Sequence, residues 1–160
     1  MYLGIDLGGT KIEGVVLSDR DPSSVIARHR IPTESQGGYS HILNRIKEVV
    51  YYLRHQAGQT PEIIGLATPG TIQPDTGRLK NSNTLCLNGQ PLRQDLEKLL
   101  GTRVIIANDA NCFALAEYHL GIRARDYPDA RVVFGVIMGT GIGGGVVIDG
   151  RIIGGHHGIG

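Results

Sequence analysis

The feature that most constrains the fold is a pair of glycine-rich turns, each lying next to apolar stretches typical of strands. The first turn, residues 8–11 (GGTK), separates predicted strands at 2–6 and 12–18. The second, residues 139–145, follows an almost wholly apolar stretch at 131–138. Successive glycines let backbone N–H groups converge on an anion, because no Cβ atom blocks its approach. The repeated arrangement favours phosphate binding and predicts two lobes with a cleft between them.

Neither turn fits a common nucleotide-binding motif. A P-loop ends in lysine and then threonine and opens a helix, whereas here Thr10 precedes Lys11 and a β-rich stretch follows. The second turn contains the pattern GxGxxG, which in a dinucleotide-binding unit is followed by a helix. The sequence instead predicts a strand and a hairpin turn at Asp149-Gly150. We therefore reject a P-loop and regard a nicotinamide-dependent dehydrogenase as a weak alternative. The simple alternative for each turn is a tight β-turn without a ligand.

The remainder of the chain alternates between predicted strands and helices. Apolar residues recur at helical spacing over 40–56, and a second apolar stripe runs from Pro91 to a stop at Gly101. The other predicted elements are strands at 24–30, 63–67 and 103–107, a helix at about 110–120, a polar loop at 71–90, and strands at 146–148 and 151–153. The order β-β-β-α-β-α-β-α, followed by further strands, predicts an α/β fold with a mixed sheet.

Composition limits the possible partners. The 160 residues carry a net charge of +1, which provides no electrostatic basis for binding nucleic acid or an anionic membrane. The longest apolar run, 132–138, is too short to span a bilayer, and charged residues interrupt the N-terminus where a signal peptide would be apolar. Cys86 and Cys112 lack CxxC spacing, so we expect reduced thiols in a cytoplasmic protein. We assign no metal to His156 and His157.

Three motifs that occur in order resemble those of the ROK family, which comprises sugar kinases and sugar-responsive repressors. They are residues 6–11 (DLGGTK), 108–111 (NDAN) and 139–144 (GTGIGG). The stretch 80–92 is similar to the fructokinase and N-acetylglucosamine kinase branch. The resemblance implies an actin-like ATPase (ribonuclease H-like) fold. It further implies an N-terminal lobe over 1–121 and the truncated start of a second lobe over 122–160.

The resemblance also implies an activity and a set of site residues. The expected reaction is ATP-dependent phosphorylation of a hexose or an N-acetylhexosamine, of the fructose, glucose or N-acetylglucosamine type. Asp109 would be the general base, and Asp6 would hold Mg²⁺ through water. The residues expected to contact the ATP phosphates are Gly4, Ile5, Asp6, Leu7, Gly8, Gly9, Thr10 and Lys11, with Gly139, Thr140, Gly141, Ile142, Gly143, Gly144 and Gly145 from the second lobe. Those expected to bind the sugar are Gly70, Thr71, Asn83, Asn108 and Asp109.

Simpler interpretations remain open for several of these residues. Asn108 or Asp109 could merely cap the helix that follows, and Asn83 and Gly70 could be ordinary turn residues. A ROK-type regulator that senses sugar without catalysis is the main functional alternative. Repressors of this family carry a helix-turn-helix before the first strand, which here is predicted at residue 2, so we favour the kinase.

The chain ends about halfway along a typical family member. The family's further sugar contacts, its structural zinc site and its adenosine pocket would all lie beyond residue 160. We therefore expect the 160 residues alone to be inactive. Strands predicted over 131–153 would lack their covering helices, and so we expect a homo-oligomer that forms through this segment.

Overall fold

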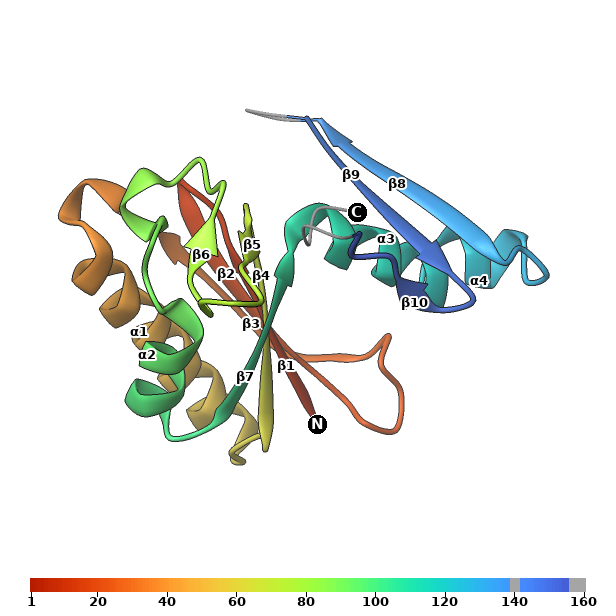
Figure 1. The fold of residues 1–160 in the computed structure, drawn as a ribbon. Helices are drawn as coiled ribbons and strands as arrows, with labels where there is room; N and C mark the ends of the chain where they lie inside the picture. The colour runs from red at the N-terminus through yellow and green to blue at the C-terminus, as the bar shows by residue number, and fades with distance from the viewer. Residues whose placement is uncertain (139–141, 156–160) are drawn as a thin grey trace. The chain divides into compact units, whose positions relative to one another are not determined.

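The computed structural model describes residues 1–138 and 142–155 (Figure 1). The chain divides into two compact units, Met1–Ile106 and Ala107–Gly160, and each is considered separately. The elements are β1 Tyr2–Leu7, β2 Lys11–Leu17, β3 Val25–Pro32, α1 Tyr39–Ala57, β4 Ile63–Thr68, β5 Thr71–Ile72, β6 Leu79–Lys80, α2 Leu92–Leu100, β7 Arg103–Asn108, α3 Asp109–His119, α4 Ile122–Asp126, β8 Val132–Met138, β9 Ile142–Ile148 and β10 Arg151–Ile152, with 3-10 turns η1 Ser35–Gly37 and η2 Leu85–Leu87.

Unit 1 is built on a five-stranded mixed sheet in the order β3-β2-β1-β4-β7. The first three strands form an antiparallel meander, and β1 pairs in parallel with β4. Side chains alternate along each strand, so every second residue faces the same side. In β1 the alternation buries Leu3, Ile5 and Leu7 and leaves Asp6 exposed on the opposite face.

Helices α1 and α2 lie on one face of this sheet (Figure 1). The apolar side chains Ile42, Ile46, Val49, Val50 and Leu53 of α1 are fully buried, and so are Leu92 and Leu96 of α2, with Leu100 slightly exposed. Burial of each such side chain contributes roughly 1.5–3 kcal/mol to the stability of the fold. Gly14 in β2 lets α1 approach closely, because a Cβ atom there would lie 2.5 Å from Leu53 Cδ1 and 2.7 Å from Val49 Cγ1. The helix ends at Gly58, whose φ of 65° is the left-handed conformation common at C-termini.

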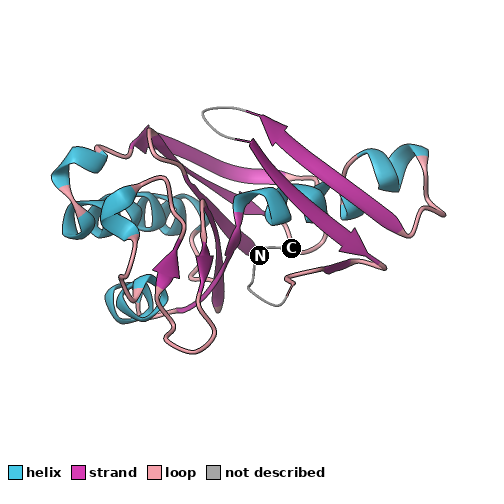
Figure 2. Ribbon diagram, turned by 45° about the horizontal axis from the view of Figure 1, so that its top comes forward, coloured by secondary structure: helices cyan, strands magenta, loops and turns pink. Residues whose placement is uncertain are grey.

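Unit 2 contains an antiparallel sheet in the order β10-β9-β8, with α3 packed on one of its faces. The β8–β9 pair forms the two long arrows of this unit in Figure 2. Gly135 of β8 and Gly145 of β9 face α3, whereas Phe134 and Val136 point to the uncovered side. Consequently only one face of this sheet is buried within the described residues.

Most of the predicted order is confirmed, including both long helices and the strand that follows each glycine turn. Three details differ. The segment 71–90 is not a plain loop, because it contains the short β5–β6 pair and η2. The short helix α4 was not anticipated. The interpretation of 139–145 as one turn is wrong for residues 142–145, which lie within β9 and pair with β8.

Candidate functional site

The first glycine turn, Gly8 to Thr10, joins β1 to β2 and closes with a 3.0 Å hydrogen bond from the Gly8 amide to the Lys11 carbonyl. It leads into a strand and not a helix, which confirms the rejection of a P-loop. Of the predicted phosphate contacts in β1, Ile5 and Leu7 have buried side chains, so only their backbone could face a ligand. Gly9, Thr10 and Lys11 are exposed.

Asp6 lies two residues before this turn, on the sheet face opposite the helices. It sits in register with Glu13 of β2, whose carboxylate pairs with Arg28 and Arg30 of β3. Partial burial tends to raise the pKa of Glu13, but its hydrogen bonds to the two guanidinium groups outweigh this and lower it. An exposed carboxylate beside a phosphate-binding turn suits Mg²⁺, which binds through one or two carboxylates, water and phosphates. Residues 1–138 and 142–155 contain no cluster of three metal-ligating side chains.

The predicted sugar-binding residues of unit 1 are held in a tight double turn. Gly70 has a φ of 90°, and a Cβ atom there would lie 2.3 Å from the Lys80 carbonyl oxygen. Thr71 opens β5 and pairs with Lys80 of β6. Asn83 is exposed between two buried neighbours, Ser82 and Thr84. The close backbone contact at Gly70 therefore fixes where the 81–84 loop begins.

Hydrogen bonds hold the 81–84 loop in place. The Asn88 side chain makes two hydrogen bonds to the backbone of Ser82, both 2.8 Å long. Its oxygen accepts from the Ser82 amide, and its nitrogen donates to the Ser82 carbonyl. The Ser82 hydroxyl accepts from the Thr84 amide at 3.2 Å. Thr84 then reaches the glycine turn, since its Oγ1 would lie 3.3 Å from a Cβ atom at Gly9. Unit 1 thus brings the predicted phosphate turn and the predicted sugar loop together.

Sequence reasoning missed Thr33, which supports the glycine turn, and Ser82 and Thr84, which shape the 81–84 loop. Thr33 follows β3, is fully buried and hydrogen-bonds to the glycine turn. Its contacts are between residues more than twenty positions apart, and no local pattern signals them.

Asn108 and Asp109 lie where β7 ends and α3 begins, in unit 2. The Asn108 side-chain oxygen accepts from the Ala110 amide at 3.0 Å and from the Asn111 amide at 3.4 Å, so it is the N-cap of α3. Asp109 Oδ1 also accepts from the Ala110 amide, at 2.9 Å. The carboxylate is half-buried and oriented by a backbone amide at a helix N-terminus, where a negative charge is stabilised.

The described part of the second glycine segment packs against the same helix end. A Cβ atom at Gly145 would lie 2.5 Å from the Ala110 carbonyl oxygen, and one at Gly143 would lie 3.2 Å from Ala110 Cβ. The glycines therefore allow β9 to approach the residue next to Asp109. Gly139, Thr140 and Gly141 lie outside the described residues. Nearby, Asn111 Oδ1 is buried and has no hydrogen-bond partner among the described residues.

Comparison with known proteins extends this picture. The ROK family model matches residues 2–160. N-acetyl-D-glucosamine kinase from Aliivibrio salmonicida is 40% identical over 98% of this chain and 49% of its own length. Among solved structures, a ROK hexokinase from Thermus thermophilus has 34% identity and a TM-score of 0.80 over 99% of this chain and 50% of its own. A ROK family glucokinase from Streptomyces griseus, in complex with glucose and AMPPNP, has 25% identity and a TM-score of 0.84, covering 99% of this chain and 47% of its own.

These matches confirm the predicted actin-like ATPase fold, to which the mixed sheet order of unit 1 corresponds. The chain spans about half the length of the curated relatives it matches. Motifs, topology and family match agree over nearly the whole chain, and the chain belongs to the ROK family.

Proposed function

We propose that this chain belongs to an ATP-dependent sugar kinase and supplies its phosphate-binding turn, part of its sugar site and its general base. The reaction transfers the γ-phosphate to a hydroxyl of a hexose or N-acetylhexosamine, of the fructose, glucose or N-acetylglucosamine type. One observation carries the proposal: the predicted phosphate turn and the predicted sugar loop lie close together in unit 1, where Thr84 Oγ1 would be 3.3 Å from a Cβ atom at Gly9. A kinase needs both binding sites side by side, because phosphoryl transfer depends chiefly on positioning and charge stabilisation.

In this proposal the backbone of Gly4 to Lys11 binds the ATP phosphates, assisted by Gly139 to Gly145 of the second glycine segment. Asp6 holds Mg²⁺ through water, and the ion neutralises charge on the phosphates. Lys11 is exposed beside the turn and adds a positive charge. As the family resemblance implies, we expect any structural zinc site to lie outside residues 1–160.

The residues that we propose for sugar binding are those that the family resemblance implies: Gly70, Thr71, Asn83, Asn108 and Asp109. Asn83 is exposed on a loop that its buried neighbours hold rigidly, and its amide can both donate to and accept from hydroxyl groups. Asp109 is the general base: it accepts the proton of the attacking sugar hydroxyl. Its hydrogen bond from the Ala110 amide occupies one carboxylate oxygen and orients the other.

We place the enzyme in the cytoplasm, where ATP is available, and treat sugar and ATP as its only small-molecule partners. The expectation of reduced thiols at Cys86 and Cys112 is in keeping with a reducing compartment. No helix in the described part of the chain has the length and apolarity needed to cross a bilayer. We retain 1–121 as the N-terminal lobe and 122–160 as the start of the second lobe.

The test uses a complete enzyme, made by joining residues 1–160 to the C-terminal half of the Aliivibrio salmonicida kinase. We expect sugar-dependent ATP consumption in a screen of hexoses and N-acetylhexosamines. Asp109→Asn should abolish turnover while sugar binding persists, because the amide keeps the hydrogen bond but cannot accept the proton. The 160-residue chain alone should show no turnover. Sugar binding without ATP consumption by the unmutated fusion would instead favour a sugar-sensing regulator.

A further inference from the structure

Thr33 makes two hydrogen bonds to the first glycine turn. Its amide donates to the Thr10 carbonyl at 3.0 Å, and its hydroxyl donates to the Gly8 carbonyl at 2.7 Å. The residue is fully buried, although a threonine hydroxyl is costly to bury without a partner. Its side chain therefore has one role visible in the structure, which is to hold the turn.

These bonds determine which backbone groups the turn presents outward. The carbonyls of Gly8 and Thr10 accept from Thr33, and that of Lys11 accepts from the Gly8 amide. The amides of Gly9 and Thr10 donate to no group among the described residues. Three carbonyls of residues 8–11 are thus satisfied internally while the amides of Gly9 and Thr10 remain available as donors, which is a polarity that favours an anion.

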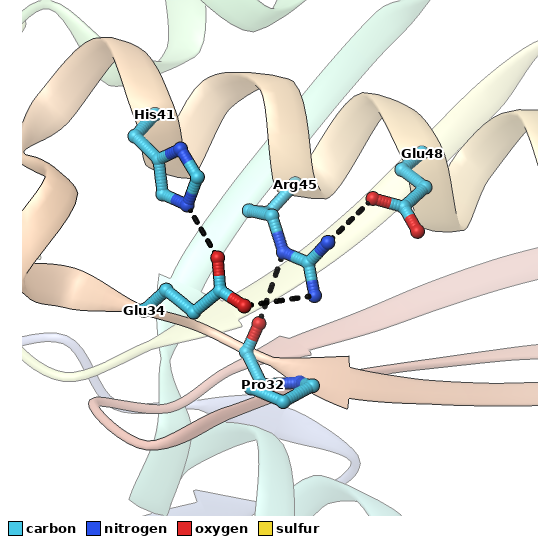
Figure 3. A network of polar contacts seen from close by, with 5 residues as sticks. All are labelled: Pro32, Glu34, His41, Arg45 and Glu48. Carbon is cyan, nitrogen blue, oxygen red and sulfur yellow. Dashed lines mark hydrogen bonds and ion pairs between the residues drawn. The ribbon is translucent and has the colours of Figure 1, made fainter.

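Helix α1 holds Pro32 and Glu34, the residues on either side of Thr33 (Figure 3). Arg45 Nε donates to the carbonyl of Pro32 at 3.1 Å. Glu34 has a φ of 53°, an uncommon conformation for a residue with a side chain. Its carboxylate lies 2.8 Å from His41 Nε2 and 3.8 Å from an Arg45 nitrogen. Helix α1 therefore anchors the residues on either side of Thr33.

We propose that Thr33 is a positioning residue for nucleotide binding: its hydroxyl turns the Gly8 carbonyl inward, and the Gly9 amide of the same peptide unit therefore points outward, toward the phosphate. This inference rests on the proposed function, since it assumes that the turn binds phosphate. Thr33 itself does not contact the ligand. Its hydroxyl acts through the Gly8 carbonyl, and so a variant that keeps the hydroxyl should keep the effect.

The test compares Thr33→Val, which has nearly the same shape but no hydroxyl, with Thr33→Ser, which retains it. Thr33→Ala provides a second variant without the hydroxyl if valine prevents folding. Thr102→Val is the matched control, because it removes a threonine hydroxyl that hydrogen-bonds to Arg54, in a different part of unit 1. Backbone amide NMR signals of the 160-residue chain are followed during titration with magnesium tripolyphosphate, a probe that needs no adenosine pocket.

We expect tripolyphosphate to shift the Gly9 and Thr10 amide signals of the unmutated chain. Thr33→Val should weaken this binding roughly tenfold, as expected for the loss of one hydrogen bond that orients the site. Thr33→Ser and Thr102→Val should bind as the unmutated chain does. Equal binding by Thr33→Val would overturn the inference and leave the proposed function intact. If the unmutated chain itself gave no shift, the phosphate role of the turn and this inference would both fail.

Discussion

A Cβ atom on Gly145 would lie 2.5 Å from the carbonyl oxygen of Ala110, so strand β9 and the first turn of helix α3 meet at backbone contact. Glycine is the only residue that permits this separation. The contact also fixes the position of the strand beside Asp109, the proposed general base. The packing of β9 on α3 and the position of β9 beside the proposed general base therefore both require glycine at position 145.

Gly145→Ala should destabilise unit 2 by at least about 2 kcal/mol, because the added methyl group meets backbone atoms that cannot turn aside. Gly144→Ala is the control on the same strand: the nearest atom to its Cβ would be 3.1 Å away, on the Phe134 ring, which is 66% exposed and can move. We expect Gly144→Ala to lower the stability of unit 2 by no more than about 0.5 kcal/mol. Urea unfolding monitored by hydrogen exchange in α3 measures both, and equal losses would contradict the packing argument.

Gly70→Ala should be more damaging than Gly58→Ala, although both glycines have positive φ. At Gly58 a Cβ atom would have no neighbour within 4 Å, so the cost is conformational, about 1 kcal/mol. At Gly70 a Cβ atom would also lie 2.3 Å from the Lys80 carbonyl oxygen, which should raise the loss to about 3 kcal/mol. Thermal unfolding compares the two variants. If Gly70 binds sugar, its variant should also bind sugar more weakly at temperatures where it remains folded.

Two substitutions distinguish the role of Asn108 as a helix cap from its proposed role in sugar binding. Asn108→Ala removes the acceptor for the Ala110 and Asn111 amides and should cost about 1 kcal/mol. Asn108→Asp retains an acceptor and should restore stability, but it lacks the amide N–H groups that a sugar hydroxyl would accept from. We therefore expect restored stability with weakened sugar binding, measured by chemical denaturation and by sugar titration of the complete enzyme. If Asn108→Asp bound sugar as tightly as the unmutated enzyme, the side-chain oxygen of Asn108 would be sufficient and its N–H groups would have no role in sugar binding.

The contribution of Glu13 to stability should depend on pH. Its pKa is lowered from an ordinary value of 4.5 by Arg28 and Arg30, which outweigh the opposing effect of burial. A lowered folded-state pKa means that the stabilisation is complete above the unfolded-state pKa and is lost as the pH falls through the folded-state pKa. Both arginine side chains are more than half exposed, so the gain should be below about 1 kcal/mol.

The corresponding measurement is the stability of Glu13→Gln relative to the unmutated chain between pH 7 and pH 3. The difference in stability between the two proteins should be constant from pH 7 down to the usual pKa range of a glutamate. It should vanish as the pH falls further. Glu62→Gln, at an exposed position, should show no such pH dependence. A difference that persisted at the acid end would mean that packing, and not the charge pair, accounts for the role of Glu13.

The regular elements of this fold could be predicted because their signals are local. The stripe of α1 at helical spacing and the glycines that end α1 and α2 mark both helices within one or two residues. The misplacement of the second glycine segment has a different physical origin, which is pairing with another strand. Gly143 to Gly145 have little intrinsic preference for a strand, yet pairing with β8 and packing on α3 place them in β9.

The same distinction applies to the candidate site. Residues whose chemistry is recorded in motifs, such as Asp6, Lys11 and Asp109, could be selected from sequence and from the family resemblance. Residues that support them could not, because Thr33 is 25 positions from the Gly8 carbonyl that it holds. Supporting contacts of this kind depend on strand register, and register depends on the whole sheet.

The last prediction concerns the uncovered face of the unit 2 sheet. Four residues of β8 point away from α3 and are exposed: Val132, Phe134, Val136 and Met138, at 43–80%. Ile142 of β9 is 82% exposed and lies in register with Met138 on the same face. An apolar sheet face of this kind is rarely left open to water. We therefore expect the 160-residue chain to self-associate through it.

Phe134→Glu should convert the assembly to a monomer, because it places a charge in the middle of the buried face. Tyr127→Glu is the matched control, since Tyr127 is 62% exposed but lies outside the sheet. Sedimentation velocity over a range of concentrations measures both, and hydrogen exchange over 131–153 reports whether the strands remain ordered. A monomer at high concentration with ordered strands would argue against self-association. An effect of Tyr127→Glu as large as that of Phe134→Glu would argue against this face as the interface.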